Sequence, residues 1–400
     1  MTPAARYQAA IEVLDTILAG QTPEPALRAW GRSARFAGSK DRAAISDHVY
    51  DVLRNRGRAA ALAGCTVPQA TGRALILGLL RLQGVAVEDV FGQMPYGPSA
   101  LSADEAKEHP TPDILSDTPD WLLALLKAEF GPDLEGLLAA MSTRAPVYLR
   151  VNTRKTTPEH VIADLAQAGV HAMADPRLAT SLEVQTGARK ITATAAYQAG
   201  LIEVQDLSVQ MAMAEIPVPQ TGRILDYCAG AGGKSLAIAA RSDADLTLHD
   251  KFPKRMGDVA LRAERAGMVY HTREDAQLDH EVPFDVVLLD VPCSGSGTWR
   301  RDPMVRWRMT PETLAALQSE QSQILDRAVA LAAPRGLIIY MTCSLLRAEN
   351  EDAVHAFLAR HPQFDLLQSR RFDPRDASDG FFFAVLQANK ASLRAAAPFA

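Results

Sequence analysis

The chain has 400 residues, of which 48% are hydrophobic and 22% are charged, and its formal net charge is −5 at pH 7. This composition is typical of a soluble globular protein with two or three domains; it argues against a wholly basic surface, although a local basic stripe would suffice to bind nucleic acid. No apolar run approaches the length of a bilayer span, and the first residues do not resemble a secretory signal, so we expect a cytoplasmic protein.

Residues 1–95 predict an all-helical domain, because apolar side chains recur at helical spacing. The first such run is Ala10, Val13, Leu14, Ile17 and Leu18. Residues 1–60 hold nine Arg or Lys against six Asp or Glu. That excess could contact phosphate, but a solvated helix face is the simpler interpretation.

The stretch MPYGPSALSADEAKEHPTPDILSDTPDW (94–121), with five prolines among small and acidic residues, predicts a linker over residues 96–120. Residues 121–200 then predict a helical connector and a small α/β subdomain. A helical pattern starts at Trp121, and the strand-like VYLRVN is followed by a helix that ends at Gly169.

The pattern changes after residue 200, where short apolar runs alternate with longer helical stretches. Runs that are apolar on both faces are expected of buried parallel strands in a doubly wound sheet. We therefore predict a Rossmann-like α/β domain over residues 201–390, with ligands at the carboxyl ends of its strands and a tail over 391–400. The clearest runs are ILDYC (224–228), LTLH (246–249), FDVVLLD (284–290) and GLIIYMT (336–342).

A glycine-rich turn follows the first of these runs. Glycines let the backbone approach a ligand and present N–H groups at a helix N-terminus. Dinucleotide enzymes, nucleotide-binding proteins and methyltransferases all use such a turn, but the spacing before Lys234 does not match a P-loop. Asp250 ends the second strand, where a carboxylate can accept the ribose hydroxyls of NAD or of S-adenosylmethionine. Asp275 follows the next strand-like piece; either acid, taken alone, could be only a loop or capping residue.

The four cysteines lie far apart and form no C-x-x-C pair, so the sequence favours neither a zinc site nor a disulfide framework, and we predict no metal centre. Cys65 and Cys228 are interpreted as structural thiols, because free cysteine is among the most buried residue types. Cys293 and Cys343 each follow a predicted parallel strand, so both should face the ligand crevice. Asp290 lies three residues before Cys293.

These motifs together resemble the Sun/Fmu (RsmB-like) family of RNA 5-methylcytosine methyltransferases. The resemblance covers residues 145–388 and, more weakly, the N-terminal region, where SKDRAAISDHVYDVLRNRGR looks like a NusB-like domain. Gly230, Ala231 and Val291 differ from the residues most common in the family and leave the backbone contacts available. The matching motifs are VQD (204–206), DYCAGAGGKS (226–235), DVPCSGSGTWRRDPMVRW (290–307), YMTCSLLRAENEDAV (340–354) and DGFFFAVL (379–386).

The resemblance implies S-adenosyl-L-methionine-dependent methylation of cytosine C5 in RNA, with small-subunit ribosomal RNA as the expected substrate. The implied fold is a Rossmann-like methyltransferase domain preceded by a small RNA-recognition-like α/β subdomain and an all-α NusB-like domain, in a monomer. By resemblance, Cys343 attacks C6 of cytosine, Asp290 pairs with ring N3, and Cys293 acts in release. DNA cytosine methyltransferases use the cysteine of the P-C motif as nucleophile. The T-C-S motif at Cys343 therefore distinguishes the RNA enzymes from the DNA enzymes. The implied cofactor-binding residues are Cys228, Ala229, Gly230, Ala231, Gly232, Gly233, Lys234, Asp250, Lys251, Arg255, Asp275 and Asp290.

Arginines interleaved with tryptophans follow the P-C motif. Basic residues with aromatics suit phosphate contacts and base stacking, whereas surface arginines around core tryptophans are the alternative. With the resemblance, we predict RNA-binding residues here and in the subdomain that starts near residue 145. They are Arg300, Arg301, Arg306, Arg308, Arg150 and Arg154.

Three alternatives remain open. The same chemistry could act on transfer RNA, because the catalytic motifs do not distinguish the two RNA classes. A non-catalytic RNA-binding assembly factor could keep the fold, but it would be expected to lose residues such as Asp290, Cys293 and Cys343. An NAD oxidoreductase is disfavoured, because no G-x-G-x-x-G with a catalytic His or Tyr constellation stands out.

Overall fold

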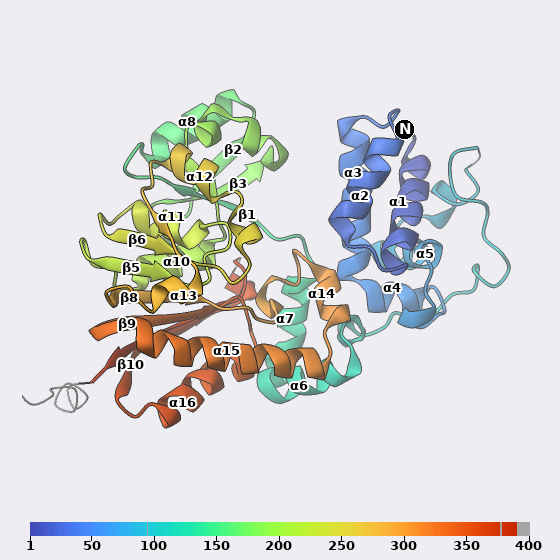
Figure 1. Cartoon of the computed structure of the whole chain (residues 1–400). Helices are drawn as coiled ribbons and strands as arrows, with labels where there is room; N and C mark the ends of the chain where they lie inside the picture. Colours follow the sequence, from blue (N-terminus) through green and yellow to red (C-terminus); the bar gives the residue numbers. More distant parts are fainter. Residues whose placement is uncertain (94, 377, 390–400) are drawn as a thin grey trace, which may run out of the picture. The chain divides into compact units, whose positions relative to one another are not determined.

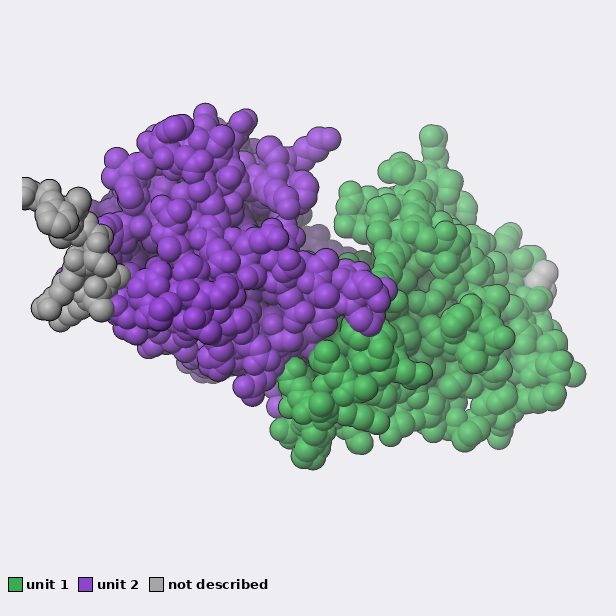
Figure 2. Space-filling view, turned by 60° about the horizontal axis from the view of Figure 1, so that its bottom comes forward, with its two compact units in different colours: residues 1–144, 299–309 green, residues 145–298, 310–400 purple. Residues whose placement is uncertain are grey.

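The structure, a computed structural model, describes residues 1–93, 95–376 and 378–389, so the predicted tail lies outside the described residues. It divides into two compact units (Figure 2). Unit 1 comprises residues 1–144 and 299–309, and unit 2 comprises residues 145–298 and the described part of 310–400. Within the described ranges, no helix combines the length and the apolar character needed to span a membrane.

Unit 1 is helical, as predicted for residues 1–95. Its core forms where α1 packs against α3 and α5, burying Leu14, Val49 and Leu75 completely. Thr2 caps α1 by accepting a hydrogen bond from the Ala5 amide at 3.2 Å. The helices are α1 (Pro3–Leu18), α2 (Pro23–Ser33), α3 (Ser39–Arg54), α4 (Arg56–Leu62), α5 (Gly72–Gln83), α6 (Asp120–Phe130), α7 (Leu134–Met141) and α14 (Pro303–Arg308).

The segment predicted as a linker, residues 96–120, is part of unit 1 instead. Arg73 of α5 binds Glu105 at 2.7 Å, and Arg58 of α4 binds the buried Asp117 at 2.7 Å. Gly57 approaches so closely that a Cβ there would lie 1.7 Å from the backbone oxygen of Ser116. These ion pairs and this close packing were not visible in the proline-rich composition, which also fits an ordered loop.

Two further segments group differently from the predicted boundaries. Helices α6 and α7, predicted with the small α/β subdomain, belong to unit 1. Residues 299–309, which lie inside the predicted methyltransferase domain, also belong to unit 1, where Met304 joins the helical core.

Unit 2 contains a small antiparallel sheet with strand order β2-β3-β1-β4. It packs on α8, with Leu149, Val161 and Leu182 in one core. This matches the predicted small α/β unit after Pro146. Its elements are β1 (Val147–Val151), α8 (Pro158–Gln167), β2 (His171–Ala174), β3 (Ser181–Thr186), α9 (Ala195–Gln198) and β4 (Ile202–Val204).

The second sheet of unit 2 has seven strands in the order β10-β11-β9-β8-β5-β6-β7. Strands β9, β8, β5, β6 and β7 run parallel, and β11 and β10 join antiparallel. The four predicted apolar runs form β5, β6, β8 and β9, which confirms the Rossmann-like prediction. The strands are β5 (Arg223–Asp226), β6 (Asp245–Leu248), β7 (His271–Thr272), β8 (Phe284–Asp290), β9 (Ala332–Thr342), β10 (Phe364–Phe372) and β11 (Phe381–Ala388).

Helices cover both faces of this sheet (Figure 1). One core joins α10, α11 and α12 to the sheet through residues such as Met213 and Leu236, and the other joins α15 and α16 through Leu325 and Phe357. Burial on both faces explains why the central strands are apolar throughout. These helices are α10 (Leu207–Glu215), α11 (Gly233–Ala239), α12 (Val259–Ala266), α13 (Asp275–Leu278), α15 (Pro311–Leu331) and α16 (Glu351–Arg360).

The strand order reverses between β5 and β8. From β5 the chain adds β6 and β7 on one side, and it then returns to place β8 and β9 on the other. Because parallel strands end at the same edge, the loops after β5, β6, β8 and β9 gather there. Asp226 pairs with Leu288, and Asp290 pairs with Met341. This register determines where the loops begin at the edge of the sheet.

Candidate active site

The glycine-rich turn joins β5 to α11. Gly230 and Gly232 have φ of +50° and +75°, a region that L side chains rarely adopt, so glycine suits both positions. The Ala229 amide donates to the His249 carbonyl at 2.9 Å, and the Gly230 amide donates to the Asp250 carboxylate at 2.9 Å. The turn is thereby tied to the end of β6.

Asp250 is the acidic residue that the sequence placed after β6, and its side chain is 1% exposed. Besides the Gly230 amide, it accepts a hydrogen bond from the Phe252 amide at 2.9 Å and lies 3.3 Å from the Arg255 guanidinium. These three partners hold its carboxylate at the carboxyl end of the strand.

A pocket of about 570 Å³ lies beside this turn. It brings together five of the predicted cofactor residues, and it adds residues that sequence reasoning missed. The predicted ones are Cys228, Asp250, Lys251, Arg255 and Asp275. The others are Tyr227, His249, Phe252, Pro253, Glu274, Pro292, Glu320, Gln323, Ile324 and Arg327.

Asp275 faces the same pocket from the start of α13. It accepts a hydrogen bond from the Tyr227 hydroxyl at 2.8 Å, and it lies 3.3 Å from the Arg327 guanidinium of α15. Burial, reinforced by the Asp275 carboxylate, raises the pKa of Tyr227. The Tyr227 ring stacks on His249 with 4.4 Å between centroids. Tyr227 and His249 stand at predicted strand ends, where they could have been found, whereas nothing in the sequence pointed to Arg327.

A second polar group lies at the switch between β5 and β8. Lys234 Nζ and Asp290 Oδ2 are 2.6 Å apart, and the Lys234 side chain is only 12% exposed. Burial alone would lower the pKa of Lys234, but the Asp290 carboxylate, together with Asp226 and Cys343, raises that pKa overall. Asp226, 1% exposed, accepts a 2.5 Å hydrogen bond from the Ser235 hydroxyl, and burial raises its pKa to about 6.

Cys293 and Cys343 meet at the ends of β8 and β9, with 3.3 Å between their Sγ atoms. Both residues are partly buried. The hydrogen bond with Cys343 raises the pKa of Cys293 well above its usual range, and burial and the nearby Glu349 carboxylate raise it further. Burial also raises the pKa of Cys65 and of Cys228, which suppresses their thiolate forms.

Comparison with known proteins assigns the chain to a family. A family model described as 16S rRNA methyltransferase RsmB/F matches residues 215–387, and a model for the ferredoxin-like domain of RsmF/B-like methyltransferases matches residues 118–189. Ribosomal RNA small subunit methyltransferase B of Xylella fastidiosa is 31% identical over 389 residues, covering 87% of this chain and 90% of that protein. The chain belongs to the RsmB/F family of methyltransferases.

Other RsmB/F relatives agree with this assignment. Ribosomal RNA small subunit methyltransferase B of Vibrio cholerae is 34% identical over 286 residues, which cover 67% of this chain and 64% of that protein. The fold matches a solved methyltransferase homologue from Pyrococcus horikoshii with a TM-score of 0.60 at 23% identity, covering 70% of this chain and all (100%) of that one. The predicted family is confirmed, and with it an S-adenosylmethionine-dependent RNA methyltransferase.

The pocket fits the cofactor of the RsmB/F family. The Asp250 carboxylate can accept ribose hydroxyls, and the carboxylate of Asp275 can accept from an adenine amino group. Apolar surfaces of Phe252, Pro292 and Ile324 line the same space, as a flat ring requires, and its volume lies within the range of small-molecule sites. S-adenosylmethionine bound there would supply an electrophilic methyl group.

Two of the arginines that follow the P-C motif and were predicted to bind RNA are buried in the structure. Arg300 and Arg306 are each 3% exposed. The Arg306 guanidinium donates to the Arg54 carbonyl at 3.1 Å and lies 5.9 Å from the Trp299 ring centroid, while burial lowers its pKa to about 10. Arg300 and Arg306 therefore do not form an exposed basic surface; inside unit 1 the Arg306 side chain binds the Arg54 carbonyl and lies beside the Trp299 and Trp307 rings.

Arg150 is likewise buried, at 8% exposure on β1. It donates to Gln205 at 2.8 Å and to the Leu236 carbonyl at 3.3 Å, and burial lowers its pKa to about 10. It therefore joins the small sheet to α11 and does not present a free cation. Arg154, Arg301 and Arg308 are exposed and stay predictions as RNA contacts.

Proposed function

We propose that this RsmB/F-family chain methylates C5 of a cytosine in small-subunit ribosomal RNA through a covalent bond between Cys343 and C6. The observation that carries the proposal is the pair of thiols held 3.3 Å apart at the ends of adjacent strands. The names of the relatives, which are small-subunit ribosomal RNA methyltransferases, support the RNA class.

The chemistry requires a nucleophile because C5 of cytosine is itself poorly nucleophilic. The Cys343 thiolate adds to C6, and the ring electrons move to make C5 an enamine carbon that can attack a methyl group. S-adenosylmethionine, when bound, supplies that methyl as an electrophile. The base must leave its stack to reach this site, because C6 is covered in a helix.

Asp290 lies next to the Cys343 strand, since its backbone pairs with Met341. With a proton from the neighbouring Lys234 ammonium, its carboxyl group can donate to ring N3 and neutralise the charge that develops there on addition. Lys234 holds that group through the 2.6 Å ion pair. The pair fixes Asp290 at the end of β8, beside the pocket for the cofactor.

Release requires removal of the C5 proton and departure of sulfur from C6. A base takes the proton, the C5–C6 double bond re-forms, and Cys343 leaves as a thiolate. Cys293 has a strongly raised pKa and so stays a thiol, which can donate its hydrogen to the departing sulfur 3.3 Å away. Loss of Cys293 should therefore affect release more than addition.

The function is tested with the purified chain, methyl-labelled S-adenosylmethionine and three substrates: 16S ribosomal RNA, small subunits and transfer RNA. We expect label in the ribosomal substrate, and bisulfite sequencing should report one protected cytosine. Label only in transfer RNA would overturn the ribosomal substrate, and label outside cytosine C5 would overturn the chemistry.

A further inference from the structure

Each of the two paired cysteines is followed by a serine, and both serines bind one buried carboxylate. The Ser294 amide donates to Glu349 Oε1 at 2.8 Å, and the Ser294 hydroxyl also donates to this carboxylate. The Ser344 hydroxyl donates to Glu349 Oε2 at 2.5 Å. Glu349 is 0% exposed. The Glu349 side chain therefore binds both the residue after Cys293 and the residue after Cys343.

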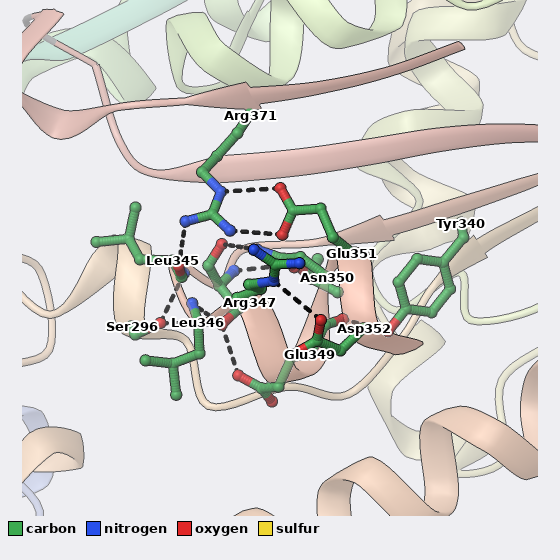
Figure 3. A network of polar contacts seen from close by, with 12 residues as sticks. Ser296, Tyr340, Leu345, Leu346, Arg347, Glu349, Asn350, Glu351, Asp352 and Arg371 are labelled. Carbon is green, nitrogen blue, oxygen red and sulfur yellow. Dashed lines mark hydrogen bonds and ion pairs between the residues drawn. The ribbon is translucent and has the colours of Figure 1, made fainter. Parts of the chain in front are cut away.

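Helix α15 and strand β9 complete this arrangement. Gln321 of α15 donates to Glu349 Oε1 at 3.0 Å and to the Pro292 carbonyl at 2.9 Å. The Tyr340 hydroxyl donates to the Glu349 carbonyl at 2.7 Å. Figure 3 shows Glu349 and Tyr340 in this network. Ser296 also takes part, because its hydroxyl bonds the Ser344 hydroxyl and accepts a hydrogen bond from the Leu345 amide.

A carboxylate in the interior is unfavourable unless its oxygens are hydrogen-bonded. Here the donors are Ser344, five residues before Glu349, and two residues that are distant in sequence, Ser294 after β8 and Gln321 on α15. Two oxygens with several acceptor sites can join these segments, whereas an apolar side chain of similar volume could pack there without joining them. The Glu349 carboxylate therefore fixes the positions of these segments relative to one another, in addition to filling space.

We propose that Glu349 is a positioning residue that locks the Cys293 and Cys343 loops together and so sets the distance between their sulfur atoms. It acts through Ser294 and Ser344. The catalytic meaning rests on the proposed function: addition by Cys343 needs only one thiol, whereas release needs both within reach. Loss of the lock should lower kcat and let the RNA adduct accumulate, with little change in KM for RNA.

The first test measures sulfur proximity without any RNA. The full chain is treated with diamide, and formation of the Cys293–Cys343 disulfide is followed by peptide mapping. One S–S bond forms, and both thiol protons with two electrons pass to diamide, which becomes its hydrazine. Glu349→Ala should slow closure by about tenfold, and Glu349→Gln, which keeps one acceptor for the Ser294 amide, should lie between that variant and wild type.

Asp352→Asn is the matched control, because Asp352 is a nearby acid that is 53% exposed and pairs with Arg347 rather than with the serines that follow the two cysteines. It should close the disulfide at the wild-type rate. If Glu349→Ala does not fold, the rate of disulfide closure in Glu349→Gln and in Ser344→Ala is compared with the wild-type rate instead. Closure at an unchanged or faster rate in the folded Glu349 variants would overturn the proposal.

A second measurement uses turnover and adduct. Glu349→Gln should lower kcat by about tenfold with KM for RNA within about threefold, and more protein should migrate as an RNA adduct on a denaturing gel. A rise in KM alone would reject the positioning role. If wild type methylates no RNA but the disulfide still depends on Glu349, the proposed function fails while the lock between the loops stands.

Discussion

The Sγ atoms of Cys293 and Cys343 lie 3.3 Å apart, although 50 positions separate the two residues in the chain. The parallel pairing of β8 with β9 brings the two strand ends together, and the loops that follow complete the approach. Two thiols at this distance can divide one reaction between attack and release. The division makes the two cysteines distinguishable by mutation.

Replacing Cys343 should abolish methyl transfer, while replacing Cys293 should trap a covalent protein–RNA adduct. Cys343→Ala removes the proposed nucleophile, and Cys293→Ala removes only the thiol proposed to assist its departure. Methyl transfer is measured with labelled cofactor, and the adduct is measured on a denaturing gel. Cys65→Ser, in unit 1, is the control and should turn over normally. Normal turnover by purified Cys343→Ala would refute the assignment of the nucleophile.

Asp250→Ala should raise the Kd for S-adenosylmethionine by about tenfold or more, because one charge-assisted contact to the ribose is worth roughly 1.5 to 3 kcal/mol. Titration calorimetry on the purified chain measures this. Asp365→Ala, an exposed acid on β10, is the control and should bind as wild type. An unchanged Kd in Asp250→Ala would exclude this pocket as the ribose site.

Asp226 should make stability depend on pH. Burial raises its pKa from 3.8 to about 6, so between these values the folded protein keeps a proton that the unfolded chain has lost. This contribution to stability is full at low pH and is lost as the pH rises through about 6. Asparagine cannot titrate, so the free energy of unfolding of wild type relative to Asp226→Asn should fall by about 1 kcal/mol from pH 5 to pH 7.5.

Urea unfolding of both proteins at several pH values checks this prediction. Asp365→Asn serves as the comparison and should show a nearly constant difference from wild type. A constant difference for Asp226→Asn as well would mean that the Asp226 carboxyl group is ionised throughout this range.

Replacing Arg306 should lower the stability of the fold, whereas replacing Arg308 should weaken RNA binding. Arg306→Ala removes a buried side chain with its hydrogen bond to Arg54 and should lower the free energy of unfolding by about 2 to 4 kcal/mol. Arg308→Ala, at the surface, should leave stability within about 1 kcal/mol but weaken RNA binding and reduce its salt dependence. Thermal unfolding and RNA titration at two salt concentrations measure the two effects. Unchanged RNA affinity in Arg308→Ala would remove Arg308 from the RNA contacts.

Much of the fold could be read from local pattern. Short runs that are apolar on both faces identified β5, β6, β8 and β9, because only strands covered by helices on both sides need such runs. The glycine-rich turn and Asp250 followed from their place at strand ends. Parallel strands end at one edge, so the site could be located before the packing was known.

Burial of the polar side chains was decided only by tertiary structure. Arg306 and Arg308 have the same local pattern, yet one is received by a carbonyl and indole rings inside unit 1 and the other is exposed. Glu349, Glu351 and Asp352 stand close together in sequence, but only Glu349 meets the serines of both cysteine loops. A sequence shows where a charge lies along the chain. Which charge loses its water, and which partners replace that water, depends on segments that only folding brings together.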